Sequence, residues 1–179
     1  MKISIKNYIK YIIYVLAVLS LIFIFLFYSF LYPLKYKDLI RKYAEINNIE
    51  PSLIASIICV ESSYKEKALS SKGALGLMQI MPKTAQWICE QNGEIFSSNN
   101  LYNPEFNIKI GSYYIDYLQK KFDNTDYAII AYNAGEGIVS EWIKKEIITY
   151  DSFKNIPYKE TLNYFFKVKK AIKIYSNRL

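Results

Sequence analysis

Residues 51–63, PSLIASIICVESS, contain the pattern that decides the fold of this chain. Pro51 suits the first turn of an α-helix, because the N–H that proline lacks has no partner there. Isoleucines then recur at helical spacing on one face, and Glu61 stands at the next position of that face, where a core residue is expected. The isoleucines are Ile54, Ile57 and Ile58. The pattern therefore predicts a core helix that ends in an acid.

Glu61 is a candidate proton donor. The last turn of a helix carries the negative end of the dipole, and an apolar environment removes water, so both effects disfavour the charged form. A glutamic acid whose pKa rises from about 4.3 towards neutrality can protonate a leaving oxygen. An exposed glutamate at a helix end is the alternative interpretation of the same spacing.

Residues 73–82, GALGLMQIMP, follow in a segment, 64–81, that has no helical pattern. Gly73 and Gly76 allow the backbone to turn sharply and to approach a bound chain. Gln79 offers amide donors and acceptors suited to hydroxyl and acetamido groups. Long irregular segments on a helical scaffold often form clefts, although an ordinary loop with core methionines is the alternative.

The rest of the chain is punctuated by Pro, Gly, Asn and Asp into pieces of helical length, without alternating strands joined by hairpin turns. We therefore expect an all-α domain. The expected helices are 36–47, 51–63, 82–91, 104–121, 126–134, 137–146 and 159–177.

The N-terminal part predicts a membrane anchor. Residues 11–34 contain no charge and exceed the roughly 20 apolar residues that cross a bilayer as a helix. A cleaved signal peptide is the alternative, but the apolar run is long and no small-residue cleavage pattern follows it. The expected organisation is a short basic segment, 1–10, an anchor, 11–34, and a folded domain, 35–179.

Charge and composition exclude several kinds of chemistry. The chain has no histidine, so Ser-His-Asp triads and Cys-His pairs are absent and carboxylates must carry any acid-base step. Cys59 and Cys89 lie in apolar contexts and are expected to be small core residues, with a disulfide left open. Residues 144–179 hold nine Lys or Arg and three acids, which suits an anionic polymer, a lipid surface or simple solvation. No nucleic-acid-binding motif is present.

Four motifs in order resemble those of family 1 lytic transglycosylases, the soluble-lytic-transglycosylase-like domains. The resemblance covers roughly residues 37–176 and implies an α-helical, goose-lysozyme-like fold that needs no metal and no cofactor. Members of that family cleave the β-1,4 bond between N-acetylmuramic acid and N-acetylglucosamine in peptidoglycan. The motifs are Glu61-Ser62-Ser63, Gly76-Leu77-Met78-Gln79, Ala131-Tyr132-Asn133-Ala134-Gly135 and Glu160-Thr161-Leu162-Asn163-Tyr164.

The resemblance assigns both proton transfers to Glu61. This residue would protonate the glycosidic oxygen and then accept the proton of the muramoyl 6-hydroxyl as that hydroxyl attacks C1, which gives a 1,6-anhydro sugar. Two departures, Glu136 where proline is common and Phe165 where a smaller residue is common, concern loop shape and substrate fit. The matching substrate-binding positions are Ser70, Gln79, Met81, Tyr132, Asn133 and Tyr164.

A peptidoglycan substrate implies a catalytic domain outside the cytoplasmic membrane, held by a single-pass anchor at 11–34 with a cytoplasmic N-terminus. The expected partners are therefore glycan strands and the membrane. A lysozyme-type hydrolase and a catalytically inert wall-binding module remain as alternatives. A third hypothesis makes the basic last helix the working part of a membrane interaction protein.

Overall fold

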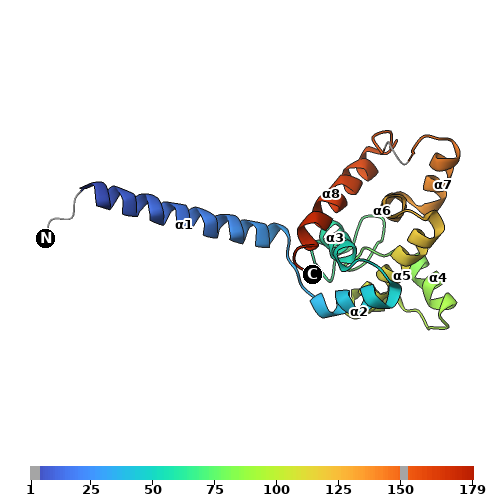
Figure 1. The fold of residues 1–179 in the computed structure, drawn as a ribbon. Helices are drawn as coiled ribbons and strands as arrows, with labels where there is room; N and C mark the ends of the chain where they lie inside the picture. Colours follow the sequence, from blue (N-terminus) through green and yellow to red (C-terminus); the bar gives the residue numbers. More distant parts are fainter. Residues whose placement is uncertain (1–4, 150–152) are drawn as a thin grey trace. The chain divides into compact units, whose positions relative to one another are not determined.

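A computed structural model describes residues 5–149 and 153–179, and the chain divides after Pro33 into two compact units. The first unit contains one helix, α1 (Ile5–Leu31) (Figure 1). Its stretch Asn7–Leu31 is long and apolar enough to cross a membrane, by length and composition. The helix ends two residues before Pro33, since proline disfavours helical backbone in the residue before it. Residues 1–4 of the expected basic segment 1–10 lie outside the described residues.

The second unit, from Leu34 onwards, is helical, and the all-α prediction is confirmed. Most expected helix ends are correct to within one or two residues, and the short η1 was not expected. Its elements are α2 (Lys37–Asn47), α3 (Pro51–Ser62), α4 (Pro82–Gln91), the 3₁₀ helix η1 (Ser98–Tyr102), α5 (Pro104–Phe122), α6 (Thr125–Ala134), α7 (Glu136–Lys144) and α8 (Lys159–Tyr175). Over the described ranges the backbone forms isolated β-bridges but no strand.

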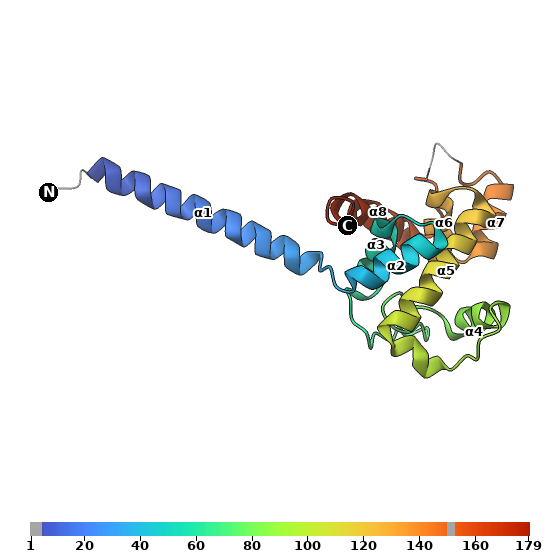
Figure 2. The same cartoon turned by 60° about the horizontal axis from the view of Figure 1, so that its bottom comes forward.

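Helix α3 is the centre of this unit. Nine of its twelve residues are buried, so the helix is covered on nearly all sides rather than along one isoleucine face. Its main packing partner is α8, beside which it lies in Figure 1. Helix α5 contacts α2, α4 and α6 (Figure 2).

Helix α6 ends in the small residues Ala131 and Ala134 and is followed by Gly135. This helix packs mainly on α5, α7 and α8. Helix α8 is the main neighbour of α3, so the acid helix is supported from the far end of the chain.

The irregular segment 64–81 is held by backbone pairing and by one buried side chain. Leu75 forms isolated antiparallel bridges with Leu69 and with Ile80. Asn107 of α5 is fully buried: its Oδ1 accepts from the Met78 N–H at 2.7 Å, and its Nδ2 donates to the Leu75 carbonyl at 3.0 Å. The Asn107 side chain thus satisfies backbone groups of this segment that a β-strand would pair with a neighbouring strand.

The two cysteines are both buried, and neither belongs to a disulfide. Cys59 belongs to α3 and Cys89 to α4, and each lies among apolar core residues. Their interpretation as core residues is confirmed, and the disulfide that the sequence left open does not form.

Candidate active site

Glu61 lies in the last turn of α3 and is partly buried. Burial is the largest influence on its carboxyl and raises its pKa from 4.5 to about 7. The interpretation of Glu61 as an exposed helix-end residue is therefore wrong, because its side chain lies where water is largely excluded. An acid with this pKa holds its proton in about half of the molecules at neutral pH.

Two residues of the α8 motif adjust this carboxyl in opposite directions. The Tyr164 hydroxyl is buried against Glu61 and lowers the pKa of the acid, whereas the exposed Glu160 raises it by charge repulsion. The approach of the Tyr164 hydroxyl falls short of regular hydrogen-bond geometry, and no other described group satisfies it. The hydroxyl is thus a polar group held beside the acid by the packing of α8 on α3.

Tyr132, near the end of α6, lies close enough to Glu61 for the charge of the acid to act on it. Its hydroxyl donates to the Met78 carbonyl at 2.8 Å, which joins α6 to the irregular segment. Burial and the nearby Glu61 raise the pKa of Tyr132 far above its usual range, so the phenol stays neutral. Tyr132 and Tyr164, distant in sequence, therefore both lie near Glu61.

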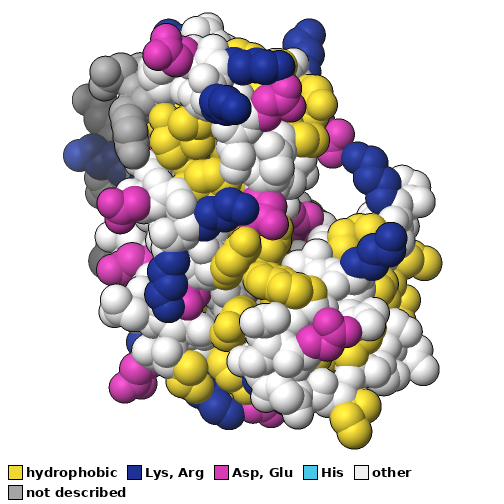
Figure 3. Space-filling model, turned by 90° about the vertical axis from the view of Figure 1, so that its right-hand side faces the viewer, with side chains coloured by type: hydrophobic (Ala, Val, Ile, Leu, Met, Phe, Trp, Pro, Cys, Tyr) yellow, Lys and Arg dark blue, Asp and Glu magenta, His cyan; other side chains and the backbone are white. Residues whose placement is uncertain are grey.

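A cleft of about 240 Å³ opens beside Tyr132. In the space-filling view, hydrophobic side chains gather in a hollow between the upper part of the face and the lower part (Figure 3). The residues that line the cleft are Gln79, Ile80, Met81, Thr84, Tyr114, Tyr132, Asn133, Ala134 and Gly135. Four of the six substrate-binding positions expected from the sequence thus meet in one cleft.

The amides of this cleft are partly used by the protein itself. Gln79 Nε2 donates to the Gly76 carbonyl at 2.9 Å and to the Ala68 carbonyl at 3.2 Å, which leaves only its oxygen for a ligand. We had expected both ends of this amide to be available. Asn133 Oδ1 accepts from the Thr161 hydroxyl at 2.8 Å, so its amide nitrogen is the end left for a ligand.

Of the remaining expected positions, Met81 lines the cleft, whereas Ser70 stabilises the neighbouring segment. Met81 is 41% exposed in the cleft, whereas Met78 is fully buried against Gly111 and fills the core. Ser70 is outside the lining of the cleft, and its Oγ accepts from the Ala74 N–H at 2.9 Å within a tight turn. Ser70 therefore shapes the segment beside the acid rather than the cleft wall.

Gly76 does not approach a bound chain. A Cβ at this position would lie 2.2 Å from the Leu101 carbonyl oxygen and 2.3 Å from Asn107 Nδ2. Gly73 differs, because no atom lies within 4 Å of its Cβ position. The close approach that we expected at Gly76 is made by the protein's own core, which is a correction to the sequence-based interpretation.

Sequence reasoning missed Asn107 and Tyr114. Asn107 was detectable as a polar residue in the apolar pattern of residues 106–110, a position that favours a buried hydrogen-bonding role. Tyr114 lines the cleft with its ring centroid 5.5 Å from that of Tyr132. Among 18 tyrosines it carried no distinguishing local signal.

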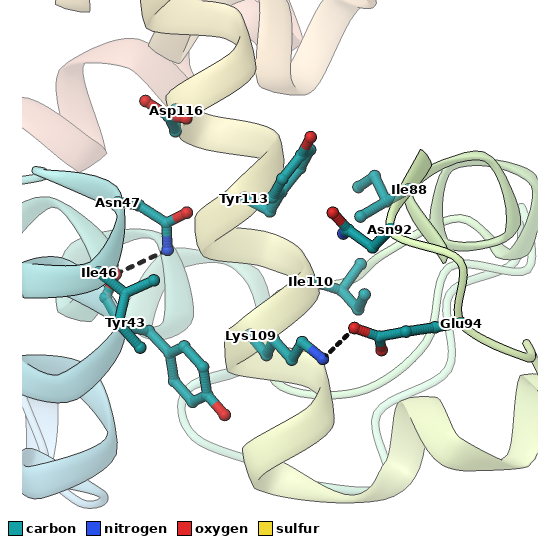
Figure 4. Close-up of a pocket in the computed structure, with 10 residues that line it drawn as sticks. All are labelled: Tyr43, Ile46, Asn47, Ile88, Asn92, Glu94, Lys109, Ile110, Tyr113 and Asp116. Carbon is teal, nitrogen blue, oxygen red and sulfur yellow. Dashed lines mark hydrogen bonds and ion pairs between the residues drawn. The ribbon is translucent and has the colours of Figure 1, made fainter. Parts of the chain in front are cut away.

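A larger cavity of about 550 Å³ lies between α2, α4 and α5 and contains none of the expected site residues (Figure 4). Both of its acids are neutralised: Glu94 pairs with Lys109 at 2.5 Å, and Asp116 pairs with Lys120 at 2.7 Å. The expected substrate-binding positions Gln79, Met81, Tyr132 and Asn133 line the smaller cleft instead, whereas Glu61 and Tyr164 lie outside its lining.

Comparisons with known proteins identify the family of this chain. The model of the transglycosylase SLT domain family matches residues 38–151. The soluble lytic murein transglycosylase of Escherichia coli K12 is 36% identical over 139 residues, which cover 74% of this chain and 22% of that protein. The membrane-bound lytic murein transglycosylase C of Haemophilus ducreyi is 34% identical over 80% of this chain and 46% of its own length.

Solved structures show the same likeness. Lytic transglycosylase Slt from Pseudomonas aeruginosa, solved as an inactive mutant, superposes with a TM-score of 0.78 at 30% identity, over 84% of this chain and 25% of that one. The 70 kDa soluble lytic transglycosylase from Escherichia coli gives a TM-score of 0.76 at 35% identity, over 80% and 24%. This chain thus spans only about a quarter of these larger proteins. On sequence and structure together, the chain belongs to the transglycosylase SLT domain family.

Proposed function

We propose that this chain is a membrane-anchored peptidoglycan lytic transglycosylase in which Glu61 is the single general acid and base. The observation that carries the proposal is the partly buried Glu61 carboxyl, whose pKa of about 7 lets it give and take a proton near neutral pH. The names of the relatives, soluble and membrane-bound lytic murein transglycosylases, support the same reaction.

In the proposed reaction, protonated Glu61 donates its proton to the oxygen that links N-acetylmuramic acid to N-acetylglucosamine. The bond from C1 to that oxygen breaks, and the N-acetylglucosamine end leaves with a new hydroxyl. The muramoyl 6-hydroxyl then attacks C1 and returns its proton to the Glu61 carboxylate. No water is consumed, and the product ends in a 1,6-anhydro ring.

The residues around Glu61 fit these two steps. Both tyrosine hydroxyls stay neutral, because burial and the nearby acid raise the pKa of each. The Tyr164 hydroxyl is a potential donor towards charge that develops on the substrate, whereas the Tyr132 hydroxyl donates to the Met78 carbonyl and holds the cleft wall. The free ends of Gln79 and Asn133 offer an acceptor and a donor to the sugars in the cleft. Ser70 and Met81 complete the proposed binding set, Ser70 through the turn it stabilises.

The anchor is proposed from α1. This helix is apolar and exposed along the described side chains of residues 7–31, as a helix surrounded by lipid would be. The relatives include proteins named membrane-bound. A peptidoglycan substrate then places the N-terminus in the cytoplasm and the second unit outside the membrane.

The test is digestion of purified peptidoglycan by the full chain in detergent, followed by mass spectrometry of the sugar products. We expect 1,6-anhydro-muropeptides from the wild type and none from Glu61→Gln. Glu45→Gln, an exposed carboxyl on α2, is the matched control and should cleave normally. Products that end in ordinary reducing muramic acid would identify a hydrolase, and glycan binding without turnover by the wild type would identify an inert wall-binding module.

A further inference from the structure

Four aromatic rings from three helices form a continuous row, which we call the aromatic row: Trp87, Tyr117, Tyr114 and Tyr132. The ring centroids of Tyr132 and Tyr114 lie 5.5 Å apart, and those of Tyr114 and Tyr117 lie 6.3 Å apart with nearly parallel planes. Trp87 meets Tyr117 edge to face at 4.8 Å. The row starts at Tyr132, which lies near Glu61, and continues over α5 to α4.

The outer half of the row extends past the cleft. Tyr132 and Tyr114 line the cleft, whereas Tyr117 and Trp87 do not. Trp87 follows Thr84 of the cleft wall by one helical turn of α4. Tyr117 follows Tyr114 of the cleft by one helical turn of α5. Each outer ring therefore lies on the same side of its helix as a residue of the cleft. Both outer side chains are partly exposed rather than buried in the core.

Charged groups hold the Tyr117 ring and add polar contacts at its edge. Glu136 accepts from the Tyr117 hydroxyl at 2.8 Å and from Lys121 Nζ at 2.6 Å. The Lys121 and Glu136 side chains are 34% and 38% exposed, so part of each faces solvent. Lys121 Nζ also lies 5.8 Å from the centre of the Tyr117 ring. Glu136 is the residue that departs from the proline common at this position, and here it orients a tyrosine.

We propose that Trp87 and Tyr117, edged by Lys121 and Glu136, form an additional glycan subsite that extends the cleft away from Glu61. This inference rests on the proposed function, because it takes a glycan chain as the occupant. Sugar rings have apolar C–H faces and polar edges, and partly exposed aromatic rings beside charged donors and acceptors match both. The partly exposed outer rings continue from the cleft, so a glycan bound in the cleft would reach Tyr117 and then Trp87 as it extends.

The test compares short and long glycans in the full chain carrying Glu61→Gln, purified in detergent so that no substrate is cut. Binding of peptide-free tetrasaccharide and octasaccharide fragments of peptidoglycan is measured by calorimetry. We expect Trp87→Ala and Tyr117→Ala to weaken octasaccharide binding about tenfold and to leave tetrasaccharide binding unchanged. Trp87→Phe, which keeps a ring, should restore most of the loss.

Phe166→Ala, a half-exposed aromatic on α8 outside the row, is the matched control and should change neither affinity. Equal losses for both lengths, or no loss for either, would overturn the subsite, with thermal unfolding used to discard a variant that no longer folds. Normal 1,6-anhydro products from wild-type enzyme in that case would leave the proposed function standing. Absence of both cleavage and binding would remove both proposals.

Discussion

At the scale of single residues, the activity of this chain is expected to follow the protonation of Glu61. The general acid must hold its proton before the bond breaks, and its pKa is about 7, so the rate should fall as pH rises through about 7. Tyr164 lowers this pKa, and Tyr164→Phe should therefore move the alkaline limb to higher pH. The measurement is initial rate against pH on purified peptidoglycan, and an unmoved limb would exclude the assigned contact.

The same carboxyl should also make stability depend on pH. Burial raises the pKa of Glu61 in the folded state from 4.5 to about 7. The contribution of this carboxyl to the free energy of unfolding is therefore fully present below about pH 4.5, where the group is protonated in both states, and is lost as pH rises through 7. Glu61→Gln removes the buried charge and should be more stable than the wild type at pH 8, by on the order of 2–3 kcal/mol. The difference should vanish below about pH 4.5. Urea unfolding at several pH values checks this, and a pH-independent difference would contradict it.

At the scale of elements, the irregular segment 64–81 depends on one glycine more than on the other. Gly76→Ala places a methyl group against Leu101 and Asn107 with φ at +77°, and should destabilise the unit by about 3 kcal/mol or more. Gly73→Ala has free space and carries only the strain of φ +87°, of about 1 kcal/mol. Denaturant midpoints of the two variants measure the contrast, and equal losses would show that the close contacts at Gly76 are not decisive.

Helix α8 combines two roles that the sequence did not separate. Its buried residues include Tyr164, Phe165 and Val168, which pack in the core, while its lysines lie largely on the outer side. Removal of residues 159–179 would therefore take away the main support of α3 and would not isolate the basic surface. The hypothesis that the basic face is the working part has to be examined by changing surface lysines such as Lys167 and Lys170 instead.

At the scale of the whole molecule, the division after Pro33 predicts that the two units are separable. A fragment of residues 34–179 contains its own core and should fold cooperatively, remain in the soluble fraction and cut isolated peptidoglycan at a rate similar to that of the full chain in detergent. The full chain should remain with membranes after a high-salt wash. A fragment that aggregates or shows no cooperative unfolding would contradict this independence.

The sequence by itself determined the helical content, the position of Glu61 at a helix end and the approximate bounds of the helices. These features depend on local signals: Pro51 in a first turn, isoleucines at helical spacing and Gly135 after a last turn. They are visible along the chain because each involves residues only a few positions apart. The family motifs indicated which side chains form the candidate site.

Only the tertiary structure decided how those residues are used. Gln79 and Gly76 were expected to serve a ligand, but the amide nitrogen of the first and the close contacts of the second serve the fold. Tyr164 and Tyr132 reach Glu61 from α8 and α6, and the aromatic row joins α4, α5 and α6. The physical reason is that burial and hydrogen-bond partners depend on contacts between residues tens of positions apart, which no local pattern specifies.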